Sequence, residues 1–156
     1  MEREALGKTI LIQTDLEQRD YIMKQVDQLG RVLARALSNL LGLKSQGDVS
    51  SGIEIVNEAL KGELYLDIEK LIAIRTDAFI AMLKEERNFS NENLDSLADI
   101  LLLEADNITT EQGKNDKRKM LYEKCLTIHQ YLEKSEATYS IDRHLKIERI
   151  KKMVIN

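Results

Sequence analysis

The longest hydrophobic pattern in the chain lies between Thr14 and Asp48. Seven apolar residues recur there at spacings of 4, 3, 4, 3, 4 and 3: Ile22, Val26, Leu29, Leu33, Ala36, Leu40 and Leu43. These spacings place them on one face of an α-helix. Thr14 with Glu17 fits a capping box at its start, and Gly47 suits its end because glycine tolerates positive φ. We predict a long first helix of about residues 15–46.

The apolar stripe on this helix is wider than a coiled-coil seam. Leu37 and Leu41 add a second apolar edge beside the seven residues of the stripe. A stripe of this width is typical of a helix in a globular core and less so of a two-stranded coiled coil. We therefore expect the first helix to be the central post of a compact domain.

Shorter segments of helical period follow the first helix. Ser51 heads a second capping-box pattern, and Gly62 suits the end of the short helix that follows it. Asp67 then opens a third segment. Thr76 caps its continuation, so we expect a kink or a short break near Arg75.

The second half of the chain predicts three further helices. Ser90 caps the first of them and Gly113 ends it, while Asp116 begins the next. A polar break over residues 135–140 precedes the last helix. No segment alternates apolar and polar residues over more than four positions, so no strand is predicted.

The totals are consistent with a single all-α domain over residues 1–156. The chain is 43% hydrophobic and has no proline, which suits a compact bundle of about six or seven helices joined by short polar turns. Residues 1–13 precede the predicted first helix, and we expect them to form an N-terminal arm.

The single cysteine and the lack of long apolar runs bear on the compartment. Cys125 has no partner for an internal disulfide, which fits a reducing environment. No stretch approaches the roughly 18 apolar residues of a membrane-spanning helix. We expect a soluble, cytoplasmic protein that does not act in a membrane.

Charge is unevenly distributed along the sequence. Residues 1–113 carry 12 basic and 21 acidic side chains, whereas residues 114–156 carry 11 basic and 6 acidic ones. Such an asymmetry would serve a partner or an antiparallel self-association. The alternative is a solvated helical surface.

The hairpin predicted around Gly47 and Asp48 resembles one tetratricopeptide unit. These two residues stand where the turn of that family has glycine and aspartate, and Gly52 and Ala59 fall at its small-residue positions. Leu40 departs from the pattern, the usual terminal proline is missing, and no second copy follows. The resemblance implies tetratricopeptide-like helical hairpins without establishing a repeat array.

A second resemblance spans nearly the whole chain. The chain resembles a family of short bacterial all-helical proteins of unknown function through Arg19-Asp20-Tyr21-Ile22-Met23, Leu40-Leu41-Gly42-Leu43, Thr138-Tyr139-Ser140-Ile141-Asp142-Arg143 and Lys146-Ile147. This resemblance supports the helical fold and implies no catalytic residue.

One group of side chains could hold a metal. Cys125, His129 and Glu133 are spaced four apart on one helical face, and His144 on the following helix could add a fourth ligand. A metal- or thiol-dependent enzyme centred on Cys125, His129 and His144 is one interpretation. In the other, Cys125 fills the core and the remaining three lie at its boundary.

Other catalytic patterns are missing. A di-iron bundle needs a glutamate three residues before a histidine, and neither His129 nor His144 has one. The zinc-protease motif is also missing from the sequence. We therefore predict no catalytic residue, no cofactor and a non-enzymatic protein.

The basic C-terminal helices offer a third interpretation, a weak nucleic-acid binder. Their basic residues include Lys117, Arg118, Lys119, Lys146, Arg149, Lys151 and Lys152. Acidic residues interrupt this field, and the overall pI near 5.3 argues against nucleic acid as the partner.

The leading prediction is a helical protein–protein interaction or scaffold module with an unknown protein partner. Arg31, Arg35, Asn39 and Lys44 are the candidates for the polar wall of its binding groove. The wide stripe of the first helix is more than a small bundle need cover, so a homodimer is a further expectation.

Overall fold

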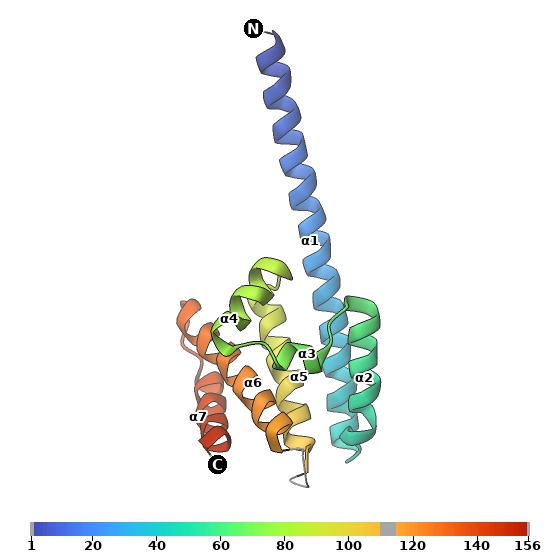
Figure 1. Cartoon of the computed structure of the whole chain (residues 1–156), viewed down its shortest axis with the longest axis vertical. Coiled ribbons are helices and arrows are strands. Elements are labelled where there is room, and N and C mark those ends of the chain that lie inside the picture. The colour runs from blue at the N-terminus through green and yellow to red at the C-terminus, as the bar shows by residue number, and fades with distance from the viewer. Residues whose placement is uncertain (1, 110–114, 156) are drawn as a thin grey trace.

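The structure, a computed structural model, is a helical bundle from which one long helix projects (Figure 1). It describes the backbone of residues 2–109 and 115–155, and the side chains of residues 14–109 and 115–155. The helices are α1 (Glu2–Ser45), α2 (Val49–Leu64), α3 (Ile68–Ile72), α4 (Thr76–Ala81) with its π-helical continuation η1 (Met82–Glu86), α5 (Asn91–Asn107), α6 (Asn115–Ser135) and α7 (Ile141–Ile155). The described residues contain no strand, which confirms the all-α prediction.

The first helix is longer than predicted. It begins at Glu2, so Thr14 lies inside it and the predicted capping box there is wrong. Residues 2–13, predicted as an arm, continue the same helix. At about 1.5 Å per residue its 44 residues span about 65 Å, whereas the 16 residues of α2 span about 24 Å.

Only the C-terminal part of α1 lies in the body. Its first buried side chain is Leu29, and of the side chains described before it only Val26 is even partly buried. The prediction that α1 as a whole is the central post is therefore wrong. The helices packed against it, α2 and α5, are too short to reach its N-terminal part.

The predicted turn between α1 and α2 is confirmed. Gly47 has a φ of +74°, and the Asp48 amide donates to the Leu43 carbonyl oxygen at 2.9 Å. Glycine is favoured at this helix end because it adopts positive φ without a steric penalty. A Cβ atom at Gly52 would lie 2.0 Å from Cδ1 of Leu43, so α1 and α2 are in close contact just after the turn.

The predicted limits of α2 are wrong at both ends. Ser51 lies inside the helix, where its hydroxyl donates to the Asp48 carbonyl oxygen at 3.1 Å. Gly62 does not stop the helix, which continues to Leu64 and ends at Tyr65 in the left-handed region. Packing of the apolar face of α2 against α1 outweighs these local signals.

Other predicted boundaries are confirmed. The carboxylate of Asp67 accepts from the Glu69 amide at the start of α3, and the Ser90 hydroxyl accepts from the Asn93 amide at the start of α5. The chain breaks between α3 and α4 near Arg75, as predicted, but Thr76 is the first residue of α4 and not its cap. The predicted end of α5 at Gly113 is wrong, because the helix ends at Asn107 and Ile108 is already extended. Gly113 itself lies outside the described residues.

The most enclosed helix is α5, which packs between α1 and α6 (Figure 1). Its fully buried apolar residues are Leu94, Leu97, Ala98, Ile100, Leu101 and Ala105. Five of these six residues lie on the apolar stripe that the sequence predicts for this segment. Ile100 does not, and Ile108, the last residue of the predicted stripe, is only partly buried. The centre of the bundle is therefore α5.

Candidate functional site

The projecting part of α1 exposes large apolar side chains to solvent. Leu16, Tyr21, Ile22 and Met23 are between 41% and 63% exposed. An isolated helix is only marginally stable in water, and helices in proteins gain most of their stability by burying an apolar face. The projecting part of α1 keeps these apolar side chains outside the bundle.

A cavity of about 330 Å³ lies where α1 leaves the body. Its lining residues come from α1, from the end of α2 and from the segment after η1: Gln25, Gln28, Leu29, Glu63, Leu64, Tyr65, Glu86, Arg87 and Asn88. Tyr65 is 85% exposed although its φ is +53°, a conformation that costs a bulky residue about 1 kcal/mol or more. An exposed aromatic ring in a strained conformation makes this cavity a candidate binding site.

Arg87 fixes the geometry of the cavity. Its guanidinium donates to the carbonyl oxygen of Leu64 at 2.6 Å and to that of Tyr65 at 3.3 Å. Carbonyl groups at the end of a helix otherwise lack partners, so this contact caps α2 and holds it against η1.

The exposed face of α1 continues the face that lines the cavity. Tyr21, Gln25 and Gln28 are spaced four and three apart, and Ile22 lies two turns before Leu29. Tyr21 and Ile22 therefore lie on the same side of α1 as the cavity, one to two turns farther from the body. Helix α2 covers this side of α1 up to Tyr65, and beyond that point the side is exposed (Figure 1).

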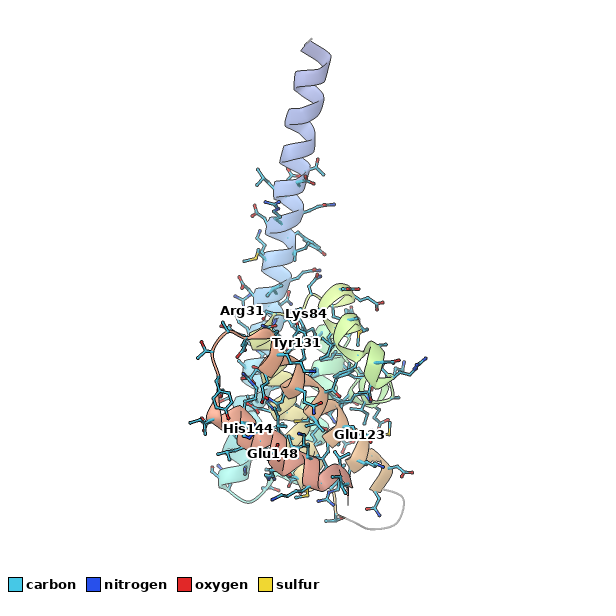
Figure 2. The ribbon with its side chains drawn as sticks, turned by 90° about the vertical axis from the view of Figure 1, so that its left-hand side faces the viewer. Arg31, Lys84, Glu123, Tyr131, His144 and Glu148 are labelled. Carbon is cyan, nitrogen blue, oxygen red and sulfur yellow. The ribbon has the colours of Figure 1, made fainter. Side chains whose placement is uncertain are left out.

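The four residues predicted as a polar wall are all exposed on α1. Arg31, Arg35 and Asn39 are spaced four apart and share one face, whereas Lys44 falls off this line. Arg35 pairs with Glu63 of α2 at 2.5 Å, and Asn39 borders a small hollow between the two helices. Figure 2 shows Arg31 near the point where α1 leaves the body.

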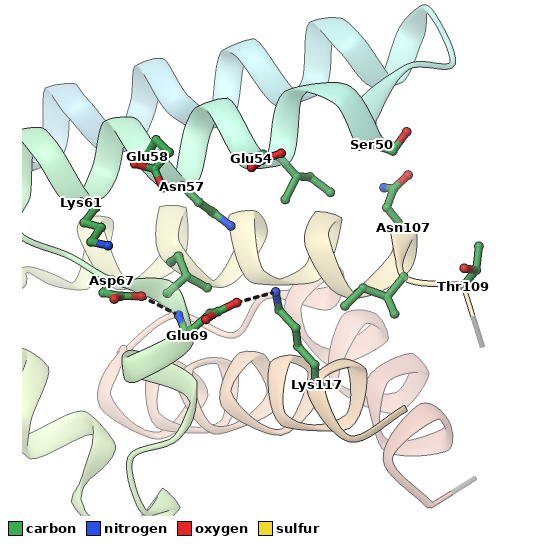
Figure 3. Close-up of a pocket in the computed structure, with 13 residues that line it drawn as sticks. Ser50, Glu54, Asn57, Glu58, Lys61, Asp67, Glu69, Asn107, Thr109 and Lys117 are labelled. Carbon is green, nitrogen blue, oxygen red and sulfur yellow. Dashed lines mark hydrogen bonds and ion pairs between the residues drawn. The ribbon is translucent and has the colours of Figure 1, made fainter. Parts of the chain in front are cut away.

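A second, larger cleft of about 600 Å³ lies between α2, α3 and the ends of α5 and α6 (Figure 3). Its charged lining residues are Glu54, Glu58, Lys61, Asp67, Glu69 and Lys117. Lys117 pairs with Glu69 at 3.4 Å across the cleft. Carboxylates outnumber ammonium groups in this lining, so the cleft favours a basic ligand.

A buried carboxyl group lies behind this cleft. Glu104 of α5 is 2% exposed and accepts from the Asn57 side-chain amide of α2 at 2.7 Å. Its second oxygen and the Asn57 amide oxygen are buried without a hydrogen-bond partner. Burial raises the pKa of Glu104 to about 7. When protonated, its second oxygen becomes a hydrogen-bond donor, which the unpaired Asn57 amide oxygen could accept.

The predicted metal ligands are dispersed. Cys125 and His129 are fully buried; the Cys125 thiol donates to the Ala98 carbonyl oxygen at 3.3 Å, and burial raises its pKa. Burial also lowers the pKa of His129, whose Nδ1 lies 4.0 Å from an Asp95 carboxylate oxygen. A protonated thiol packed in a core is neither a nucleophile nor a metal ligand in that state.

The other two candidates lie on the surface. His144 of α7 lies 3.9 Å from the carboxylate of Glu133, and its ring lies against Tyr139. Across residues 14–109 and 115–155, no three histidine, cysteine or acidic side chains are grouped to hold a metal ion.

Three basic residues of α7 pair with acidic residues of α5. Arg143 lies 3.5 Å from Asp95, Lys146 lies 3.1 Å from Asp99, and Arg149 lies 2.9 Å from Asp106. Part of the excess positive charge near the C-terminus is thus paired with acidic residues of α5, in a row of ion pairs between α7 and α5. Asp106 also accepts from the Tyr122 hydroxyl at 2.6 Å.

Two features of these sites were not predicted from the sequence. Nothing near Tyr65 signals a left-handed residue, because glycine and asparagine are the usual occupants. Glu104 did leave a signal, since it stands three residues after Leu101 and seven after Leu97, on the apolar stripe of α5.

Comparison of the chain with models of protein families, with curated proteins and with solved structures gives no match. In the part of the chain that the structure describes, no helix is long and apolar enough to cross a membrane.

Proposed function

We propose that this protein is a non-enzymatic helical interaction module whose projecting α1 binds a helix of a partner protein. One observation carries the proposal: α1 continues beyond the end of α2 with Tyr21 and Ile22 exposed on the side that α2 covers lower down. The partner helix would lie in line with α2 and complete this side of α1.

The chemistry of the exposed face supports this geometry. Fully burying a side chain such as Ile22 contributes about 1.5–3 kcal/mol, and tyrosine is enriched among residues that dominate binding energy. Tyr65 lines the cavity at the base of the projection, and Tyr21 lies one turn before Gln25, another residue of its lining. The partner helix would therefore present an apolar stripe along α1 and end in the cavity beside Tyr65.

The polar residues of α1 have a secondary role in this proposal. Arg31 is exposed near the base of the projection, on a neighbouring face of α1, whereas Asn39 borders the hollow between α1 and α2. Exposed charges at the rim of an interface affect association rates and specificity more than affinity. They would orient the partner, and the apolar residues would hold it.

Affinity capture with point variants tests the proposal. Tagged wild-type protein, Ile22→Asp and Ile55→Asp are each incubated with a lysate of the source organism. Ile55 is also an exposed isoleucine, but it lies on α2, away from the projecting part of α1. We expect the wild-type protein and Ile55→Asp to retain the same partner and Ile22→Asp to lose it.

The opposite result is equally clear. If Ile22→Asp and Tyr21→Asp retain every protein that the wild type retains, the projecting face is not the binding site. Circular dichroism on each variant shows whether the helical body is intact. Loss of binding therefore reports on the surface and not on unfolding.

A further inference from the structure

The last helix, α7, has two different faces. Arg143, Ile147, Ile150 and Val154 are spaced four, three and four apart and pack toward the bundle. The opposite face repeats the same spacing with five exposed residues: Ile141, Leu145, Glu148, Lys152 and Ile155. In Figure 2 α7 crosses the front of the bundle, with Glu148 labelled on it.

The composition of the outer face is unusual for a surface helix. Ile141, Leu145 and Ile155 are between 61% and 84% exposed. The outer face of such a helix normally carries polar residues, and apolar residues in register are typical of an interaction site. The stripe also holds one acidic and one basic residue, which restricts what can cover it.

We infer that the outer face of α7 binds the same face of a second copy of this chain, with the two helices antiparallel. In an antiparallel pair of helices, a stripe residue before the two-fold axis faces the stripe residue of the other copy that lies equally far after the axis. One two-fold register then places Leu145 against Ile155 of the second copy and Glu148 against its Lys152. The symmetry repeats each contact, so two apolar pairs and two ion pairs form.

The charges select the second copy and its direction. In a parallel pair Glu148 would face Glu148 and Lys152 would face Lys152, which is repulsive at both levels. In the antiparallel pair every charge on the stripe meets its opposite. A two-fold interface requires one surface to be complementary to itself, and the four stripe residues from Leu145 to Ile155 meet that requirement.

The contact is small. Helix α7 has 15 residues and is about 22 Å long, so the pair buries less than the roughly 800 Å² per partner of a standard interface. We expect dissociation in the micromolar range or weaker. This surface is separate from the projecting part of α1, and the dimer does not depend on the function proposed for that part.

Sedimentation equilibrium over a series of protein concentrations tests the dimer. We expect a monomer–dimer equilibrium for the wild type and a monomer for Leu145→Glu. Ile55→Glu places the same charge on α2 and should leave the equilibrium unchanged. A wild type that stays monomeric throughout the series overturns the inference, and so does a dimer that Leu145→Glu leaves intact.

Charge reversal tests the register. Glu148→Lys and Lys152→Glu should each weaken the dimer about tenfold or more by creating like-charge pairs, and the double variant should restore it. Lys151→Ala is the matched control, because Glu148 also pairs with Lys151 in its own helix at 3.5 Å. A double variant no tighter than the single ones would contradict the antiparallel register.

Cysteine cross-linking tests the direction independently. Under mild oxidation the double variant Leu145→Cys/Ile155→Cys should form a covalent dimer, whereas each single variant should not. The native Cys125 is fully buried and does not compete. Cross-linking of either single variant would indicate parallel helices. If sedimentation equilibrium shows that Ile22→Asp loses the dimer and Leu145→Glu keeps it, the dimer forms through α1 and not through α7.

Discussion

The two parts of α1 share one sequence pattern but have different surroundings. From Leu29 to Leu43 the stripe is covered by α2 and α5, and Leu33 and Leu40 are fully buried. At Ile22 the same 4-3 spacing continues, yet this side chain is exposed. The spacing determines which face of a helix is apolar, whereas the lengths of the neighbouring helices determine whether that face is covered.

The largest expected difference between the two parts is in stability. Leu40→Ala should lower the free energy of unfolding by about 3 kcal/mol, because it opens a cavity in a fully buried site. Ile22→Ala, at an equivalent position of the stripe, should change it by less than about 0.5 kcal/mol. Urea denaturation followed by circular dichroism measures both values.

Equal losses for the two variants would contradict the comparison. They would mean that the projecting part of α1 is covered when the protein is alone in solution. Repeating the measurement for Leu145→Glu shows whether the dimer contributes, since that variant removes the proposed α7 contact and leaves α1 unchanged.

The second difference is in the pH dependence of stability. Helices α2 and α5, which cover the part of α1 in the body, are linked by the hydrogen bond between Asn57 and Glu104. Folding raises the pKa of Glu104 from 4.5 to about 7, so the folded state keeps its proton where the unfolded state loses it. The free energy of unfolding from this group therefore falls by about 3 kcal/mol as pH rises from about 4.5 to about 7. It is flat above that range.

Glu104→Gln tests this sign. The variant carries a neutral amide at every pH, so we expect it to lose the decline between about pH 4.5 and 7 and to exceed the wild type in stability at pH 8. Glu54→Gln is the control, because Glu54 is an exposed carboxylate of the neighbouring cleft. An identical pH slope for wild type and Glu104→Gln would show that Glu104 is ionised in the folded protein.

The comparison also explains which parts of the fold could be predicted. The caps at Asp67 and Ser90 and the turn at Gly47 depend on contacts within a few residues, so the local sequence was sufficient to locate them. Thr14 and Ser51 fit the same capping patterns but lie inside helices. Continuous helices on both sides of these residues outweigh a cap worth about 1 kcal/mol.

The candidate sites were harder to predict than the helices. The cavity beside Tyr65 is formed by three elements, and the Arg87 contact that shapes it joins residues more than 20 positions apart. Cys125 lies in the core, as one of the two interpretations predicted, but His129, which that interpretation placed at the boundary of the core, is also fully buried. Periodicity along one segment carries no information on contacts between segments.

The smallest expected effect lies at the boundary between the two parts of α1, where Tyr65 ends α2. Tyr65→Gly should raise the free energy of unfolding by about 0.5–1 kcal/mol, because glycine adopts the φ of +53° without strain and the lost ring is mostly exposed. The same change should weaken binding of the proposed partner helix. Thermal unfolding and affinity capture measure the two effects on one variant.

These two effects separate a binding role for Tyr65 from a structural one. A tyrosine kept in a strained, exposed position costs stability, which is expected where a side chain serves recognition. Asn88→Gly is the control, since Asn88 also has a positive φ of 57° and borders the same cavity without an aromatic ring. If Tyr65→Gly lowers the free energy of unfolding, the Tyr65 ring packs on the body and has a structural role. The main observation for placing the end of the partner helix in this cavity would then be lost.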